Sequence, residues 1–235
     1  MVDDEFYRLP VAGDRNLGSD TKFIITEGSS KDFVTQYEAF TYQTNSRAKV
    51  NEYSSLKDTI FGDKGIDCAF PSVEEGVAFI FSDNLCAKWS YGLKNPKNKL
   101  LVGPSPIEEV FPYLKGTVFA NGLDAAFETS RPYEFYLFKG DNYARIFYEG
   151  AGKLLNSSPI RQNWVTLRGT IFEKSIDGSF SLDHDTYPNS VYIFKGDTYA
   201  RVTYTPGTAT EKLDNLAKIK SYWTGLGSML PRSNH

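Results

Sequence analysis

Short runs of aromatic and aliphatic residues recur along the chain, and each run ends in small polar residues. The clearest runs are residues 78–81, 135–138 and 191–194, which read Ala-Phe-Ile-Phe, Phe-Tyr-Leu-Phe and Val-Tyr-Ile-Phe. Ser82-Asp83-Asn84 follows the first, and Lys-Gly-Asp at 139–141 and 195–197 follows the other two. Runs of this length flanked by turn residues are typical of antiparallel strands joined by tight hairpins.

The hairpins belong to a longer internal repeat. A phrase that begins and ends in phenylalanine and contains an aspartate near its middle occurs at residues 61–70, 119–127 and 172–180. Asp67 and Asp124 lie 57 residues apart, and Asp124 and Asp177 lie 53 apart. Each repeat is predicted to contain three strands, a short helix and a closing strand. In the best-defined repeat, residues 99–107 are predicted as a basic, proline-containing loop, 108–112 as a helical turn and 117–119 as the closing strand.

A weaker copy of the repeat precedes these three. Residues 22–25 correspond to its second strand, 32–37 to its third and 59–61 to its closing strand. Repeats that consist mostly of strands cannot bury their faces alone, so they arrange radially or stack. The sequence therefore predicts an all-β fold, a four-bladed β-propeller that forms one domain over residues 1–235. Its blades are expected at about 5–61, 62–119, 120–172 and 173–230.

Composition narrows the class of protein. Hydrophobic residues make up 40% of the 235 residues and aromatic residues 15%, enough for a substantial core that favours strands. A net charge of -3 argues against a nucleic-acid partner. The acidic N-terminus is followed by no apolar run, so we expect no membrane partner and a cytoplasmic location.

Two features at the start of the first strand of each repeat suggest chemistry. Small residues at Ala69, Ala126 and Ser179 would allow close packing near a common axis. Asp67, Asp124 and Asp177 would meet at one mouth of that axis, where a cation would offset their repulsion. The alternative is that each aspartate caps a turn through neighbouring backbone amides, and the two roles are compatible.

The remaining candidates are few. Arg145 and Arg201 are predicted to pair with acidic side chains at the adjacent turns, such as Asp141 and Asp197. His184 is the only internal histidine and is weighed as a ligand-binding residue against a solvated loop side chain. No phosphate-binding glycine loop, zinc signature or nucleophile elbow occurs, so no catalytic residue is predicted.

The motifs quoted above resemble the hemopexin-repeat seed albumins of legumes, the albumin-2 group. Further motifs carry the resemblance: Ile-Asp-Cys-Ala-Phe at 66–70, Gly-Pro-Ser-Pro-Ile at 103–107, Phe-Pro-Tyr-Leu-Lys-Gly-Thr-Val-Phe at 111–119 and the segment 136–145. It covers residues 60 to 227 well and the first repeat weakly. The resemblance implies a four-bladed propeller whose axial channel holds calcium with sodium and chloride.

The resemblance also implies site residues. The family's axial ligands are largely backbone carbonyls at the first inner-strand residue of each blade, here Asp67, Asp124, Asp177 and, in the divergent first blade, Val11. Ala69, Ala126 and Ser179 form the next layer. Family members bind polyamines such as spermine, haem or red-cell glycans, and His184 is the internal imidazole that could ligate haem.

Three classes of function stay open at this point. The first is a binding protein for a small ligand, either a polyamine or haem, in seed storage or stress sensing. The second is a carbohydrate-binding lectin or an interaction module that uses the blade rims. The third is an enzyme that uses a remodelled pocket. The oligomeric state is open as well, a homodimer included.

Overall fold

The computed structural model describes residues 5–9, 22–25, 46–49, 53–74, 76–91, 98–182 and 187–222. The first three ranges and residues 220 and 222 are described by backbone alone. The chain forms two compact units. The first unit consists of residues 1–105 and 219–235, and the second consists of residues 106–218.

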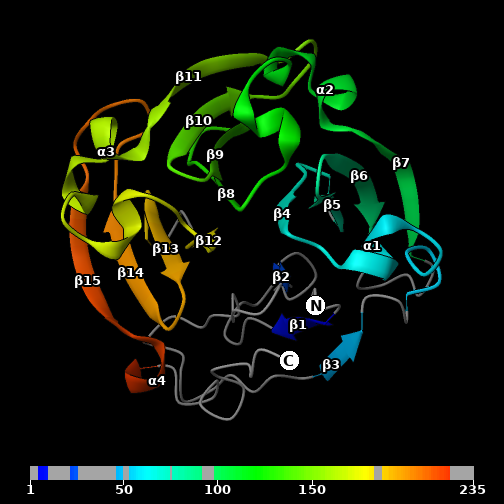
Figure 1. Cartoon of the computed structure of the whole chain (residues 1–235), viewed down its shortest axis with the longest axis horizontal. Helices are drawn as coiled ribbons and strands as arrows, with labels where there is room; N and C mark the ends of the chain where they lie inside the picture. The colour runs from blue at the N-terminus through cyan, green and yellow to red at the C-terminus, as the bar shows by residue number, and fades with distance from the viewer. Residues whose placement is uncertain are drawn as a thin grey trace. The chain divides into compact units, whose positions relative to one another are not determined.

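The second unit contains two four-stranded antiparallel sheets in which each strand pairs with the next along the chain. Figure 1 shows β8 and β12 next to each other, with β11 and β15 at the far edges of their sheets. The strands are β8 (Ala125–Glu128), β9 (Glu134–Lys139), β10 (Asn142–Phe147), β11 (Lys153–Pro159), β12 (Gly178–Ser181), β13 (Ser190–Lys195), β14 (Thr198–Thr203) and β15 (Lys212–Lys218).

The first unit contains a third sheet of the same kind, in the order β4-β5-β6-β7. Its strands are β4 (Cys68–Pro71), β5 (Val77–Ser82), β6 (Leu85–Ser90) and β7 (Lys99–Pro106). Further strands β1 (Glu5–Leu9), β2 (Lys22–Ile25) and β3 (Ser46–Lys49) form a sheet in the order β2-β1-β3. The strand predicted at 22–25 is confirmed, whereas the one predicted at 32–37 lies outside the described residues.

The hairpins form as predicted. β5 pairs with β6, β9 with β10 and β13 with β14, all antiparallel. Each turn contains one residue with positive φ: Asp83 at 49°, Gly140 at 55° and Gly196 at 55°. Glycine adopts this conformation without a steric penalty, and aspartate tolerates it better than most residues.

Two predictions about the ends of the repeat are wrong. Residues 99–106 form strand β7 instead of a loop, and its prolines are accommodated because the order of the described strands places β7 at an edge of its sheet. The closing strands predicted at 117–119 and 59–61 are helical: the first is the 3-10 helix η3 (Val118–Asn121), and the second leads into α1 (Ile60–Lys64).

A threonine causes these helical turns. Thr59, Thr117 and Thr170 each accept a hydrogen bond from the backbone N–H two residues later and donate one to the carbonyl three residues earlier. A side chain that caps in this way satisfies an N–H at the start of a helical turn. The phenylalanine two residues after each threonine is fully buried: Phe61, Phe119 and Phe172.

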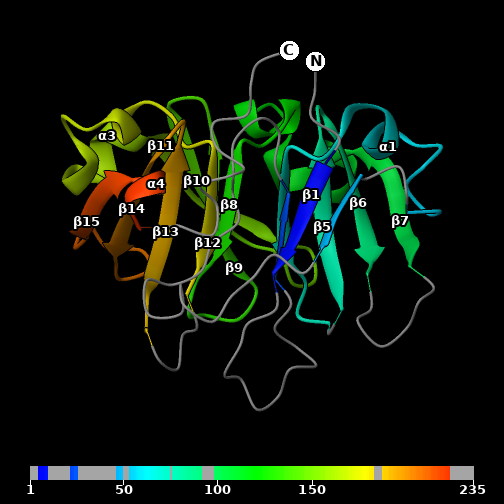
Figure 2. The same cartoon turned by 90° about the horizontal axis from the view of Figure 1, so that it is seen from below.

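The other short helices follow the outer strands. Figure 2 shows α3 (Ile160–Asn163) near an end of the strands of the second unit. The remaining elements are α2 (Ile107–Val110), α4 (Ile219–Tyr222), η2 (Pro112–Leu114), η4 (Val165–Leu167) and η5 (Ile171–Glu173). No helix among the described residues is long and apolar enough to cross a membrane.

Aromatic residues fill the core of the second unit. Trp164 follows α3 and is 3% exposed. Its ring contacts those of Phe127, Tyr136, Phe138, Tyr143 and Tyr204 at centroid distances of 5.2 to 6.1 Å. Phe127 belongs to β8, whereas Tyr204 follows β14, so this cluster joins the two sheets.

The two cysteines are free thiols, as the strand order predicts. Cys68 on β4 lies opposite Phe81 on β5, and Phe81 lies opposite Cys86 on β6, so two interstrand steps separate the cysteines. Two steps of about 4.8 Å exceed the reach of a disulfide.

Thiol labelling should distinguish the folded and unfolded chains. Both cysteines are buried, and burial raises the pKa of Cys86 to about 12, so little reactive thiolate forms at pH 8. We expect negligible labelling of the native protein and two labelled thiols per chain in denaturant without reductant. Finding no thiol in denaturant would contradict the strand order of this sheet.

Candidate functional site

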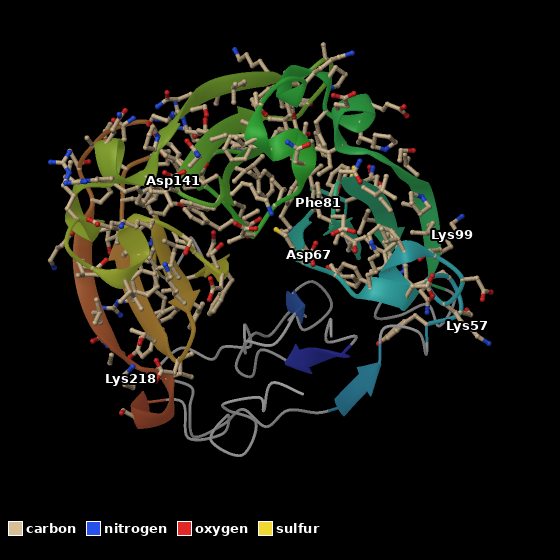
Figure 3. The ribbon with its side chains drawn as sticks, viewed as in Figure 1. Lys57, Asp67, Phe81, Lys99, Asp141 and Lys218 are labelled. Atoms are coloured by element: carbon tan, nitrogen blue, oxygen red, sulfur yellow. The ribbon has the colours of Figure 1, made fainter. Side chains whose placement is uncertain are left out.

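Asp67, Asp124 and Asp177 occupy the same local structure immediately before or at the start of the first strand of three sheets. The backbone N–H of each donates to a phenylalanine carbonyl on the neighbouring strand at 2.8 Å. These carbonyls belong to Phe81, Phe138 and Phe194. Figure 3 labels Asp67 and Phe81, which lie close together in the first unit. The repeat thus fixes the main chain at these three positions in the same way.

Each aspartate carboxylate also binds the hairpin turn that follows the second strand. Oδ2 of Asp67 accepts from the backbone N–H of Asp83 at 2.8 Å. The corresponding bonds run from Gly140 to Asp124 at 2.6 Å and from Gly196 to Asp177 at 2.8 Å. The turn-capping role considered as the alternative from sequence is therefore observed in all three repeats.

Lysines add charge at two of these turns. Lys139 Nζ lies 2.7 Å from Asp124 Oδ1, and both side chains are about one-third exposed. In the first unit, Lys64 Nζ lies 2.7 Å from Asp83 Oδ2, and this hydrogen bond raises the pKa of Lys64. A turn amide engages each of the three carboxylates, and an ammonium group also engages that of Asp124. A cation beside them would therefore be coordinated through main-chain oxygens.

The residues of the predicted second layer follow the three aspartates by two positions, on the first strand of each sheet. Ala69, Ala126 and Ser179 lie opposite Ile80, Leu137 and Ile193 in the sheet register. Ser179 Oγ is buried and has no hydrogen-bond partner among the described residues. A buried hydroxyl without a partner loses free energy unless an ion, water or ligand satisfies it. This atom therefore fits a polar occupant beside β12.

Other predicted ligands cannot be placed. Val11 and His184 lie outside the described residues. Within the described part of the chain, no three histidine, cysteine or acidic side chains gather closely enough to hold a metal ion. The chemistry available at the three repeats is thus that of carbonyl and hydroxyl oxygens, hard donors that suit calcium or sodium.

The predicted partners of the two arginines are wrong. Arg145 pairs with Glu134 at 3.2 Å and Arg201 with Asp214 at 3.8 Å. Asp141 instead accepts from Asn142, and Asp197 pairs with Lys218. The reason is the antiparallel pairing, which brings residues of neighbouring strands closer to the arginines than the turn residues that precede β10 and β14.

Sequence reasoning also missed how the β14–β15 loop is held. Gly207 donates its backbone N–H to Tyr136 Oη at 3.0 Å. A Cβ at Gly207 would lie 2.2 Å from Arg145 Nη1, so the guanidinium packs directly on the glycine backbone. Because Tyr136 and Arg145 belong to the neighbouring sheet, this loop joins the two sheets of the second unit. The single Gly207 is the only signal that the sequence offers for it.

Comparison with known proteins identifies the class. No family model matches the chain. Albumin-2 from Pisum sativum is 43% identical over 185 residues, which cover 77% of this chain and 78% of its own length. Albumin-2 from Lathyrus sativus is 44% identical over 181 residues, with 76% and 78% covered.

Solved structures agree with these relatives. A plant albumin from Cicer arietinum showing hemagglutination matches with a TM-score of 0.76 and 41% identity, covering 82% of this chain and 85% of its own. A plant lectin with two metal binding sites, also from Cicer arietinum, matches with a TM-score of 0.75 and 37% identity, covering 98% of this chain and 91% of its own. The hemopexin fold protein CP4 from cow pea matches with a TM-score of 0.77 and 30% identity, covering 98% of this chain and 92% of its own.

The fold and the repeated aspartate turn thus place the molecule among proteins of the hemopexin fold. The chain belongs to the albumin-2 family of legume seed proteins.

Proposed function

We propose that this chain is a binding protein that holds a hard cation at the repeated start of its first strands. The observation that carries the proposal is the shared setting of Asp67, Asp124 and Asp177, whose backbone N–H and carboxylate bonds hold the main chain in the same way at three positions. Calcium, alone or with sodium and chloride, suits such oxygen donors. The Cicer arietinum lectin described with two metal binding sites supports the proposal.

The resemblance to legume albumins assigns the ligands of the proposed cation to the carbonyl oxygens of these aspartates and of Val11, which lies outside the described residues. Ser179 Oγ, which lacks a partner among the described residues, offers a polar contact in the next layer. A calcium ion bound there would offset the negative charge of the aspartates and stabilise the folded chain by mass action.

A small organic ligand is the second part of the proposal. A polyamine such as spermine would be attracted by the same carboxylates, and haem would use His184 as an axial ligand. Calorimetric titration with spermine and absorbance titration with haemin separate the two ligands.

Calcium should raise the melting temperature of chelator-treated protein, and EGTA should lower it again. At a calcium concentration about one hundred times the dissociation constant, the gain is about 2.7 kcal/mol. Asp124→Asn keeps an oxygen acceptor for the Gly140 amide, so it should retain most of the calcium-induced rise. Asp124→Ala removes the acceptor, frees the turn and should reduce the rise.

Asp141→Asn is the matched control, because Asp141 is exposed at the same turn and does not bind the turn amide. It should leave the calcium-induced rise unchanged. Wild-type protein whose melting is indifferent to both calcium and EGTA would refute the proposed site.

Carbohydrate binding is the second candidate function. The observation in its favour is that two similar structures from Cicer arietinum are described as a lectin and as an albumin showing hemagglutination. A glycan array tests this candidate independently of calcium.

A further inference from the structure

One turn of the second unit carries a residue in an unfavourable backbone conformation. Tyr133 precedes β9 and has a φ of 62°. A bulky side chain rarely adopts positive φ, because its Cβ approaches the following carbonyl. Such residues often mark functional sites, where the cost is offset by a role of the side chain.

The other sheets show what this position requires structurally. The backbone carbonyls of Gly76, Tyr133 and Asn189 accept the same hydrogen bond, from Tyr91, Tyr148 and Tyr204 respectively, at 2.9 to 3.0 Å. Gly76 has a φ of 72° and Asn189 a φ of 54°. Glycine and asparagine are the residues that tolerate this conformation best. The repeat therefore does not need a tyrosine here.

Aromatic residues surround Tyr133 at the end of the β9–β10 hairpin. Its ring meets Phe147 at 6.0 Å and Tyr148 at 5.6 Å, both edge to face. Tyr148 in turn contacts Phe135 at 5.5 Å. Tyr133, Phe147 and Tyr148 are each partly exposed, so the cluster reaches the surface. We name these three residues the aromatic cluster.

Polar groups of both signs border the aromatic cluster. Glu149 is exposed, and its charge and its hydrogen bond with the phenol raise the pKa of Tyr133. Arg131, two residues before Tyr133, is exposed, and its Nη1 lies 3.7 Å from Oε2 of Glu134. Aromatic rings beside a carboxylate and a guanidinium offer a flat apolar contact with hydrogen-bond donors and acceptors at its rim.

We propose that the aromatic cluster with Glu149 is a binding site for a neutral pyranose unit of a glycan. The C–H face of a pyranose would pack on a ring, and its hydroxyls would donate to Glu149 and accept from Arg131. Arg131, Glu134, Arg145 and Glu149 contribute two positive and two negative charges near this turn, and this balance favours a neutral ligand over a cation such as a polyamine. This inference rests on the second candidate function, carbohydrate binding.

The variant Tyr133→Asn tests the site and is expected to keep the fold. It places at residue 133 the residue that occupies the equivalent position 189, so the variant should melt at or above the wild-type temperature. Its affinity for a glycan bound by the wild type should fall about tenfold or more, which corresponds to the loss of one aromatic contact with its hydrogen bond. Glu149→Gln should weaken the same binding without changing the melting temperature.

The experiment compares wild type, both variants and Tyr187→Asn on an array of neutral and sialylated glycans, followed by titration of the strongest neutral glycan. Tyr187 precedes β13 in the corresponding connection of the next sheet, and its replacement should leave binding unchanged. Binding by the wild type that Tyr133→Asn retains in full would overturn this site but leave carbohydrate binding intact. An array on which the wild type binds nothing would refute both. Spermine is titrated into the same proteins, and spermine binding that depends on Tyr133 would replace the glycan by an ammonium ligand.

Discussion

Trp164→Ala is expected to lower the free energy of unfolding by about 3–5 kcal/mol, the usual cost of truncating a fully buried large aromatic residue. Trp164 is 3% exposed and touches five aromatic rings. Its removal leaves a cavity between the β8–β11 and β12–β15 sheets, which the strands cannot close without moving their register. Urea denaturation followed by circular dichroism measures the loss as a lower midpoint.

The control is Val118→Ala, because Val118 is 43% exposed in the same unit. Its effect should stay within about 0.5 kcal/mol. A Trp164→Ala variant that loses less than about 1 kcal/mol would show that this tryptophan does not hold the two sheets together.

Glu134→Leu is expected to cost about 3 kcal/mol, because it leaves the guanidinium of Arg145 without its carboxylate. The side chain of Glu134 is 7% exposed and that of Arg145 is 17% exposed, so water screens the pair only weakly. Arg145 also packs on Gly207, and the unpaired charge would therefore loosen the β14–β15 loop. Chemical denaturation of purified variants measures this cost.

A second substitution separates the unpaired charge from lost packing. Arg145→Met in the Glu134→Leu background removes the buried charge and should recover much of the stability. The exposed pair between Asp197 and Lys218, with both side chains 61% exposed, is the comparison, and Asp197→Asn should cost less than about 1 kcal/mol. A double variant no more stable than Glu134→Leu alone would argue against the charge as the cause.

Local structure could be predicted from the sequence where short-range patterns of residues determine it. The three hairpins follow from apolar runs that end in Asp83, Gly140 and Gly196, residues that tolerate positive φ. The free thiols follow from the order of three adjacent strands. The hemopexin fold is shown by the comparisons, whereas the number of blades stays a prediction.

The wrong predictions concern positions where a local sequence pattern favours one structure and the pairing of strands or a side-chain cap produces another. Pro104 and Pro106 argue for a loop, yet an edge strand can accommodate them. Thr117 resembles a strand residue next to Val118 and Phe119, but its hydroxyl caps a helical turn instead. The partners of Arg145 and Arg201 depend on register across neighbouring strands, which a local pattern does not contain.

The equivalence of the three aspartates could be predicted from the sequence, whereas a cation at these positions stays a prediction. Repetition identified Asp67, Asp124 and Asp177, because three equivalent residues in related repeats share one environment. The sequence alone left both roles of the carboxylate open, and the amides of Asp83, Gly140 and Gly196 now account for it. Tyr133 was not predicted, since only its φ of 62° distinguishes it from other tyrosines.

The most direct test of the proposed cation site is native mass spectrometry of the full chain, purified without chelator and then exchanged into EGTA. We predict a mass that exceeds the polypeptide by bound calcium before the exchange, and the polypeptide mass alone after it. The polypeptide mass alone in both samples, unchanged when calcium is added back, would contradict the proposal that the repeated aspartate positions hold a cation.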